Sequence, residues 1–104
     1  MQHFTDVFNK KIRLSDERAN HLIETHPEIK SQIEKIKETL LNPDLIIQSK
    51  TDDEVDLYYK YYLVTTVGEK YLCVVVKVTI DDSFIITAYF TDSIKGGEIL
   101  WKKK

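Results

Sequence analysis

Two of the three histidines lie where an imidazole could act as a general acid or base. His21 and His26 are five residues apart, and an unperturbed imidazole titrates at about pH 6.5. A spacing of four, not five, places two histidines on one helical face for a metal, so we expect no metal site. Arg18 lies beside His21 on the expected helix, whereas His26 falls in its apolar stripe, just before Pro27. Both histidines also fit purely structural roles: His26 at the end of the helix and His21 on its solvated face.

A second group of polar residues follows from the pairing expected for the last two strands, 71–80 and 84–92. Each strand carries apolar side chains at alternate positions. Opposed residues of an antiparallel pair share a face, and a slip of one residue moves every side chain to the other face. To place both apolar sets in one core, Ile80 must oppose Phe84 across a three-residue loop, 81–83.

This register brings Lys77, Thr87 and Tyr89 together on the outer face of the hairpin. Lys77 is expected opposite Thr87, with Tyr89 beside them. A cation next to hydroxyl groups can hold a phosphate. The same residue types also suit an ordinary half-exposed strand.

A run of four tyrosines is interrupted by Lys60. If the run is a strand, Tyr58, Lys60 and Tyr62 share one face, and Tyr59 and Tyr61 share the other. Aromatic rings with an interleaved lysine could stack on bases and contact phosphate. They are equally common as strand-forming residues.

The elements that position these residues are predicted to be mainly helices in the first half of the chain and strands in the second half. Ser15 can cap a helix that ends before Pro27, and apolar residues at helical spacing give it one buried face. A second apolar stripe predicts a helix from Glu28 to Leu41. Residues 9–14 alternate polar and apolar side chains, which favours a short edge strand.

The second half of the chain reads as strands at 45–50, 57–67, 71–80 and 84–92. We therefore predict an α+β fold in which two N-terminal helices pack on one face of a four-stranded antiparallel sheet, with a further short N-terminal edge strand. The C-terminal residues 94–101 are expected to turn at their glycines and pack Leu100 or Trp101 on the sheet.

Length and composition describe one folded domain, residues 1–104, with 42% hydrophobic and 31% charged residues. The formal net charge of −2 lacks the basic excess of many nucleic-acid-binding proteins. Cys73 is the only cysteine, which is typical of a reducing compartment. No apolar run approaches the roughly 18 residues of a membrane span, and the N-terminus lacks a signal peptide's basic and apolar regions. We therefore expect a cytoplasmic protein without membrane contact.

Short motifs recur along the chain in a definite order. The first half carries Ile12-Arg13-Leu14-Ser15, Glu17-Arg18-x-x-His21-Leu22-Ile23-x-x-His26-Pro27-Glu28 and Thr39-Leu40-x-Asn42-Pro43-Asp44. The second half carries Leu57-Tyr58-Tyr59, Val74-Val75-Val76-Lys77, Ile86-Thr87-Ala88-Tyr89-Phe90-Thr91 and Ile94-Lys95-x-Gly97-Glu98-x-Leu100-Trp101. Together they resemble the phage-associated branch of the barnase–EndoU–colicin–RelE-like (BECR) nuclease fold, over roughly residues 12–102.

The resemblance implies a ribonuclease-like domain that needs no metal ion or other cofactor, from a group associated with toxins, phage and mobile elements. Its partners would then be RNA and an antitoxin or other protein. The matching polar residues are Arg18, His21, His26, Lys77, Thr87 and Tyr89.

In that mechanism a 2′-hydroxyl attacks the adjacent phosphodiester and leaves a 2′,3′-cyclic phosphate. His26 would act as general acid or base with Tyr89 as its partner or as a hydroxyl donor, and Lys77 with Arg18 would stabilise the negative phosphorane. Arg18, His21, Lys60 and Thr87 would help bind the substrate. His26 and the Lys77 face meet only if the end of the first helix lies at an edge of the sheet.

The alternative is a non-catalytic binding or accessory domain that keeps the fold and binds protein or nucleic acid through the outer face of its sheet. The lack of a basic excess and the tyrosine-rich strand favour this alternative. The sequence does not choose an oligomeric state, because an exposed edge strand on either side of the sheet could support dimerisation.

Overall fold

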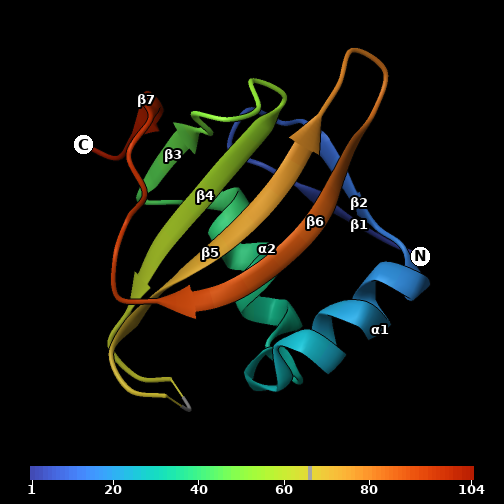
Figure 1. Cartoon of the computed structure of the whole chain (residues 1–104), viewed down its shortest axis with the longest axis vertical. Helices are drawn as coiled ribbons and strands as arrows, with labels where there is room; N and C mark the ends of the chain where they lie inside the picture. The colour runs from blue at the N-terminus through green and yellow to red at the C-terminus, as the bar shows by residue number, and fades with distance from the viewer. Residues whose placement is uncertain (66) are drawn as a thin grey trace.

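One mixed β-sheet organises the chain (Figure 1). The computed structural model describes residues 1–65 and 67–104. Within them, seven strands lie in the order β1-β2-β6-β5-β4-β3-β7. In chain order the elements are β1 (Gln2–Thr5), β2 (Lys11–Leu14), α1 (Asp16–Thr25), η1 (Pro27–Ile29), α2 (Ile33–Leu41), β3 (Leu45–Gln48), β4 (Val55–Tyr62), β5 (Lys70–Val78), β6 (Ser83–Thr91) and β7 (Glu98–Lys102).

The predicted four-stranded antiparallel sheet is wrong. Three short strands, β1, β2 and β7, extend it, and β2 pairs with β6 in parallel through Arg13 and Phe84. The strand expected near residues 9–14 exists as β2, but β1 lies outside it as the true edge. The turn between β1 and β2 is held by buried Asp6, whose Oδ1 accepts from the backbone N–H of Phe8 and Lys10 at 3.0 and 2.8 Å. β1 has only four residues, too few to give a clear period, which is why the sequence pattern missed it.

The first helix forms as its sequence predicts. Ser15 Oγ accepts from the Arg18 backbone N–H at 3.1 Å, and Asp16 and Glu17 place negative charge in the first turn. The second helix begins at Ile33 and not at Glu28. A 3₁₀ turn follows Pro27, and Ser31 adopts a left-handed conformation with φ of 67°, so the chain cannot continue as one helix from Glu28.

Apolar side chains cover both faces of the sheet. The face toward the helices holds the larger core; its fully buried members include Ile12, Leu22, Ile36, Leu40, Tyr58, Leu72 and Val74. The opposite face, toward the viewer in Figure 1, holds a second cluster of Ile47, Leu57, Tyr59 and Cys73, against which Tyr71, Tyr89 and Ile94 pack. We call this opposite side the outer face. No helix in the described part of the chain has the length and hydropathy to cross a bilayer.

The β5–β6 hairpin departs from the predicted register. Its loop is residues 79–82, where the Thr79 N–H donates to the Asp82 carbonyl at 2.8 Å. Ile80, expected in the core, is 98% exposed at the tip. Val75 pairs with Thr87 but Val76 pairs with Ile85, so one residue of β6 bulges out between them. The bulge reverses the alternation, and Ile85 is therefore buried where the sequence pattern favours Phe84 and residue 86.

The C-terminus returns to the sheet as expected, but as a strand. β7 pairs with β3, and Trp101 packs against the core on the helix side while Leu100 remains exposed. Residues 92–97 connect β6 to β7 and carry Ile94 onto the outer face. This connection brings residues distant in sequence to β4, the strand that carries the tyrosine run.

Candidate active site

His26 and Tyr89 meet where the end of α1 reaches the outer face. Their ring centroids are 5.7 Å apart with an interplanar angle of 31°. Figure 1 shows α1 beside β6, whereas α2 lies behind the centre of the sheet. Because β2 pairs with β6 only at Arg13 and Phe84, the C-terminal half of β6 has, among the described residues, no strand on the side away from β5. The end of α1 occupies that space and lets His26 reach round to Tyr89.

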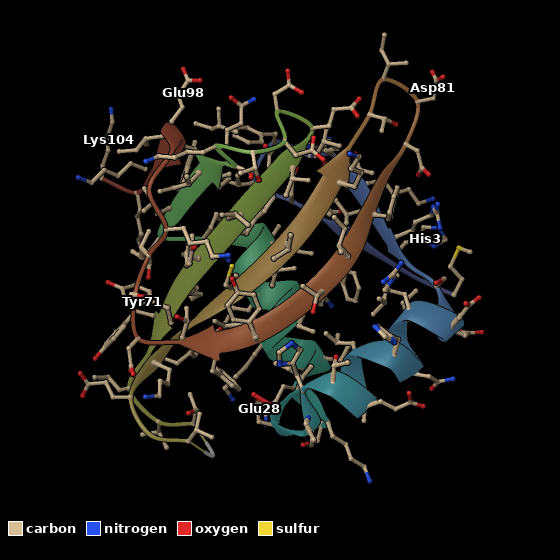
Figure 2. The ribbon with its side chains drawn as sticks, in the orientation of Figure 1. His3, Glu28, Tyr71, Asp81, Glu98 and Lys104 are labelled. Carbon is tan, nitrogen blue, oxygen red and sulfur yellow. The ribbon has the colours of Figure 1, made fainter. Side chains whose placement is uncertain are left out.

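Local structure holds the imidazole of His26 in place. The His26 backbone N–H donates to the Leu22 carbonyl at 2.8 Å, ending α1, and its own carbonyl accepts from the Ile29 N–H at 2.9 Å. Glu28 Oε2 lies 3.9 Å from His26 Nδ1, and the two side chains are 28% and 34% exposed. Figure 2 shows Glu28 near the C-terminal end of β6. The backbone bonds at the end of α1 thus fix the position of His26, and a carboxylate lies on the Nδ1 side of its ring.

Three residues form a row across neighbouring strands beside His26. Tyr89 of β6 pairs with Cys73 of β5, which pairs with Tyr59 of β4. Burial raises the pKa of Cys73 to about 11, although hydrogen bonds to Tyr89 and Tyr59 lower it in part. Burial likewise raises the pKa of Tyr89 and raises that of Tyr59 to about 12. At neutral pH this row therefore presents hydroxyl donors and a protonated thiol, not a thiolate nucleophile.

Lys95 adds a cation that was not among the site residues predicted from the sequence pattern. Its backbone N–H donates to Tyr59 Oη at 3.1 Å. Its ammonium is close enough to lower the pKa of the Cys73 thiol electrostatically. Lys95 is exposed and forms no ion pair with the described residues. The sequence signal that could have identified Lys95 is its place in the motif Ile94-Lys95-x-Gly97, which follows the last long strand.

Lys77 lies on the outer face, but away from His26. Its Nζ is 2.8 Å from Asp52 Oδ2 and 3.4 Å from Glu54 Oε1. The hydrogen bond to Asp52 is the main reason that the pKa of Lys77 is raised. Four residues along β5 separate it from Cys73, which is about 13 Å of extended chain. Lys77 therefore lies away from the row of Tyr89, Cys73 and Tyr59 that is next to His26.

The remaining predicted site residues are also dispersed. Thr87 lies on the outer face two positions before Tyr89, paired with Val75 and not with Lys77. Arg18 and His21 line a surface depression of about 570 Å³ along α1. Lys60 lies on the helix side of the sheet, where its Nζ donates to the Asn42 carbonyl at 3.0 Å.

No group of three or more His, Cys, Asp or Glu side chains that could hold a metal ion occurs within residues 1–65 and 67–104. The groups that the structure does bring together are an imidazole, phenols and an ammonium on one face of the sheet. Such groups can transfer a proton and bind an anion.

Fold and site together define a small α+β domain whose outer face brings His26, Tyr89 and the row of Cys73 and Tyr59 together. The chain belongs to the family described as phage-Barnase-EndoU-ColicinE5/D-RelE like nuclease 2, whose model matches residues 1–102. This confirms the resemblance seen in the sequence motifs. No curated protein and no solved structure gives a significant match.

Proposed function

We propose that the chain is an endoribonuclease whose active centre is formed by His26, Tyr89 and Lys95 on the outer face. Membership of a nuclease-like family supports nucleic acid as the substrate. The observation that carries the proposal is the contact of the His26 and Tyr89 rings, whose centroids are 5.7 Å apart. Tyr89 neighbours Cys73, whose pKa the Lys95 ammonium lowers electrostatically.

The three groups match the needs of phosphodiester cleavage by a neighbouring 2′-hydroxyl. His26 takes the proton of the 2′-hydroxyl as its oxygen bonds to phosphorus, and returns the proton to the 5′-oxygen as the P–O5′ bond breaks. The Tyr89 hydroxyl donates to a non-bridging oxygen, and the Lys95 ammonium offsets the added negative charge. The products are a 2′,3′-cyclic phosphate and a 5′-hydroxyl, and the scheme requires no metal ion.

The test is cleavage of labelled single-stranded RNA in excess EDTA. We expect His26→Ala to lower the rate by about 10²- to 10⁴-fold, the usual contribution of a positioned acid or base. Lys95→Ala is expected to cost about 10²- to 10³-fold, as for loss of an oxyanion donor. His3→Ala and Lys37→Ala are matched controls on β1 and α2 and should cleave like wild type.

The same assay separates the two candidate cations. The sequence pattern assigns the phosphate-binding role to Lys77, whereas we assign it to Lys95. Loss of cleavage in Lys77→Ala together with wild-type rates in Lys95→Ala would refute our assignment. Wild-type rates in His26→Ala would remove the mechanism altogether.

A non-catalytic nucleic-acid-binding domain is the second candidate. It is favoured because two cations of the outer face are each paired with a carboxylate. Arg13 Nη2 lies 2.7 Å from Asp82 Oδ2, and Lys77 contacts Asp52. These ion pairs reduce the positive charge available to RNA. RNA binding without cleavage across varied sequences would select this candidate.

We also propose a toxin role with an antitoxin partner, supported by the phage-associated character of the family. Expression of the wild-type chain should then arrest growth of a bacterial host, and the His26→Ala variant should not. Equal growth with both proteins would argue against the toxin role.

A further inference from the structure

The outer face carries a second row of aromatic residues beside the proposed active centre. Tyr61 of β4 pairs with Tyr71 of β5, which pairs with Thr91 of β6. Tyr71 lies two residues before Cys73 on the same strand, which is about 7 Å along β5 from the first row. Figure 2 places Tyr71 toward the β4 side of the sheet, away from α1.

Ring contacts connect the two rows. The Tyr59 and Tyr71 ring centroids are 6.3 Å apart at 87°, and those of Tyr71 and Tyr61 are 5.1 Å apart at 66°. Tyr59 is fully buried, Tyr71 is half-buried and Tyr61 is 36% exposed. The three rings therefore lead from the Lys95 contact on Tyr59 outward to solvent.

The edge-to-face arrangement leaves aromatic surface free for a ligand. In such a pair, one ring presents its edge to a single face of the other, so the edge-on ring keeps both of its own faces. A hydrogen bond to Glu69 is the main reason that the pKa of Tyr61 is raised to about 12. Glu69 thus keeps the Tyr61 hydroxyl protonated at neutral pH, so the exposed ring stays uncharged.

The other tyrosines of the run are already engaged on the helix side. The Tyr58 hydroxyl donates to Asp6 Oδ2 at 2.6 Å, and the Tyr62 hydroxyl donates to Glu38 Oε1 at 2.6 Å. Tyr58 is fully buried, and Tyr62 packs against the larger core. The structure therefore divides the run into a structural half and an outer half that faces the same side as His26.

We propose that Tyr61 and Tyr71 form a stacking subsite for an unpaired nucleobase of single-stranded RNA, next to the nucleotide whose phosphate lies at His26, Tyr89 and Lys95. The subsite rests on the proposed ribonuclease function for its position relative to the cleaved bond. Stacking on an aromatic ring accepts every base, so the subsite selects single-stranded over paired RNA and has little base preference.

Binding of a non-cleavable probe tests the subsite separately from catalysis. The probe is a short fluorescent 2′-O-methyl oligoribonucleotide, measured by anisotropy in EDTA. We expect Tyr61→Leu and Tyr71→Leu each to raise Kd, by roughly 5- to 150-fold per lost stacking contact. Tyr61→Phe and Tyr71→Phe keep the ring and should bind within about twofold of wild type. Leu63→Ala, which removes an exposed apolar side chain just beyond β4, is the control and should bind normally.

Abasic probes locate the stacked base. One abasic position should weaken binding to wild type and have no further effect on the Tyr71→Leu variant. Binding that is equally weak in the Phe and Leu variants, or the absence of any such coupled position, would overturn the subsite. Because the probe cannot be cleaved, failure to cleave RNA would remove the nuclease proposal while leaving this result intact.

Discussion

Replacing Gly97 by alanine tests whether the chain between β6 and β7 positions Lys95. A Cβ atom at residue 97 would overlap the Gln48 carbonyl oxygen and lie 2.6 Å from Ile47 Cγ2. Both residues belong to β3. The backbone of Gln48 and the buried side chain of Ile47 cannot move freely. The variant should therefore push residues 92–97 away from the sheet and weaken the Lys95–Tyr59 hydrogen bond.

The expected cost follows from this overlap. Forcing an extra carbon into a packed region typically costs about 1–3 kcal/mol of unfolding free energy. For a domain of this length each kcal/mol lowers Tm by roughly 4–8 °C, so the variant should melt about 4–24 °C below wild type. Gly96→Ala is the matched control, since its Cβ would meet only the flexible end of Lys50, at 3.0 and 3.2 Å. Its stability should lie within about 0.5 kcal/mol of wild type.

The assay combines urea unfolding by circular dichroism with fluorescence of Trp101. Trp101 is the only tryptophan and lies in β7, so its emission reports the docking of that strand. In Gly97→Ala we expect a red-shifted emission before the main transition and slower RNA cleavage. Equal stability and activity in the two alanine variants would refute the close approach at Gly97. A destabilised Gly97→Ala protein with full activity would refute the positioning role of the connection.

Three further predictions concern buried groups. Tyr58→Phe removes the hydrogen bond to the Asp6 carboxylate and should lower the free energy of unfolding in urea by about 1.5–3 kcal/mol, whereas no loss would mean that the bond adds nothing. Burial raises the pKa of Asp56 above its ordinary value, so its charge destabilises the fold at neutral pH. Asp56→Asn should therefore raise Tm at pH 7. This gain should shrink as the pH falls through the raised pKa of Asp56 and disappear below about pH 4, where the carboxyl is protonated in both the folded and the unfolded state; a gain independent of pH would contradict this reasoning. Cys73 is buried with a pKa of about 11, so the native thiol should resist iodoacetamide at neutral pH and react once denatured; rapid native alkylation would contradict both its burial and its protonation.

Local patterns in the sequence were enough to predict the first helix and the two faces of β4 and β5. Ser15 and Pro27 define the limits of α1 through capping and backbone geometry, which depend only on neighbouring residues. Alternation along β4 correctly separates Tyr58 from Tyr59, because successive side chains of a strand point to opposite faces. The match of the family model to residues 1–102 likewise confirms a resemblance carried by short motifs.

Tertiary structure alone decided the strand order, the register of the last hairpin and the composition of the candidate site. The bulge in β6 reverses the alternation of buried and exposed side chains, whereas the sequence pattern predicts that the alternation continues unbroken along the strand. His26 meets Tyr89 because the short pairing of β2 leaves half of β6 for the end of α1 to cover. Lys95 joins them because β7 pairs with β3, a contact between segments about 50 residues apart that depends on packing energy and not on local propensity.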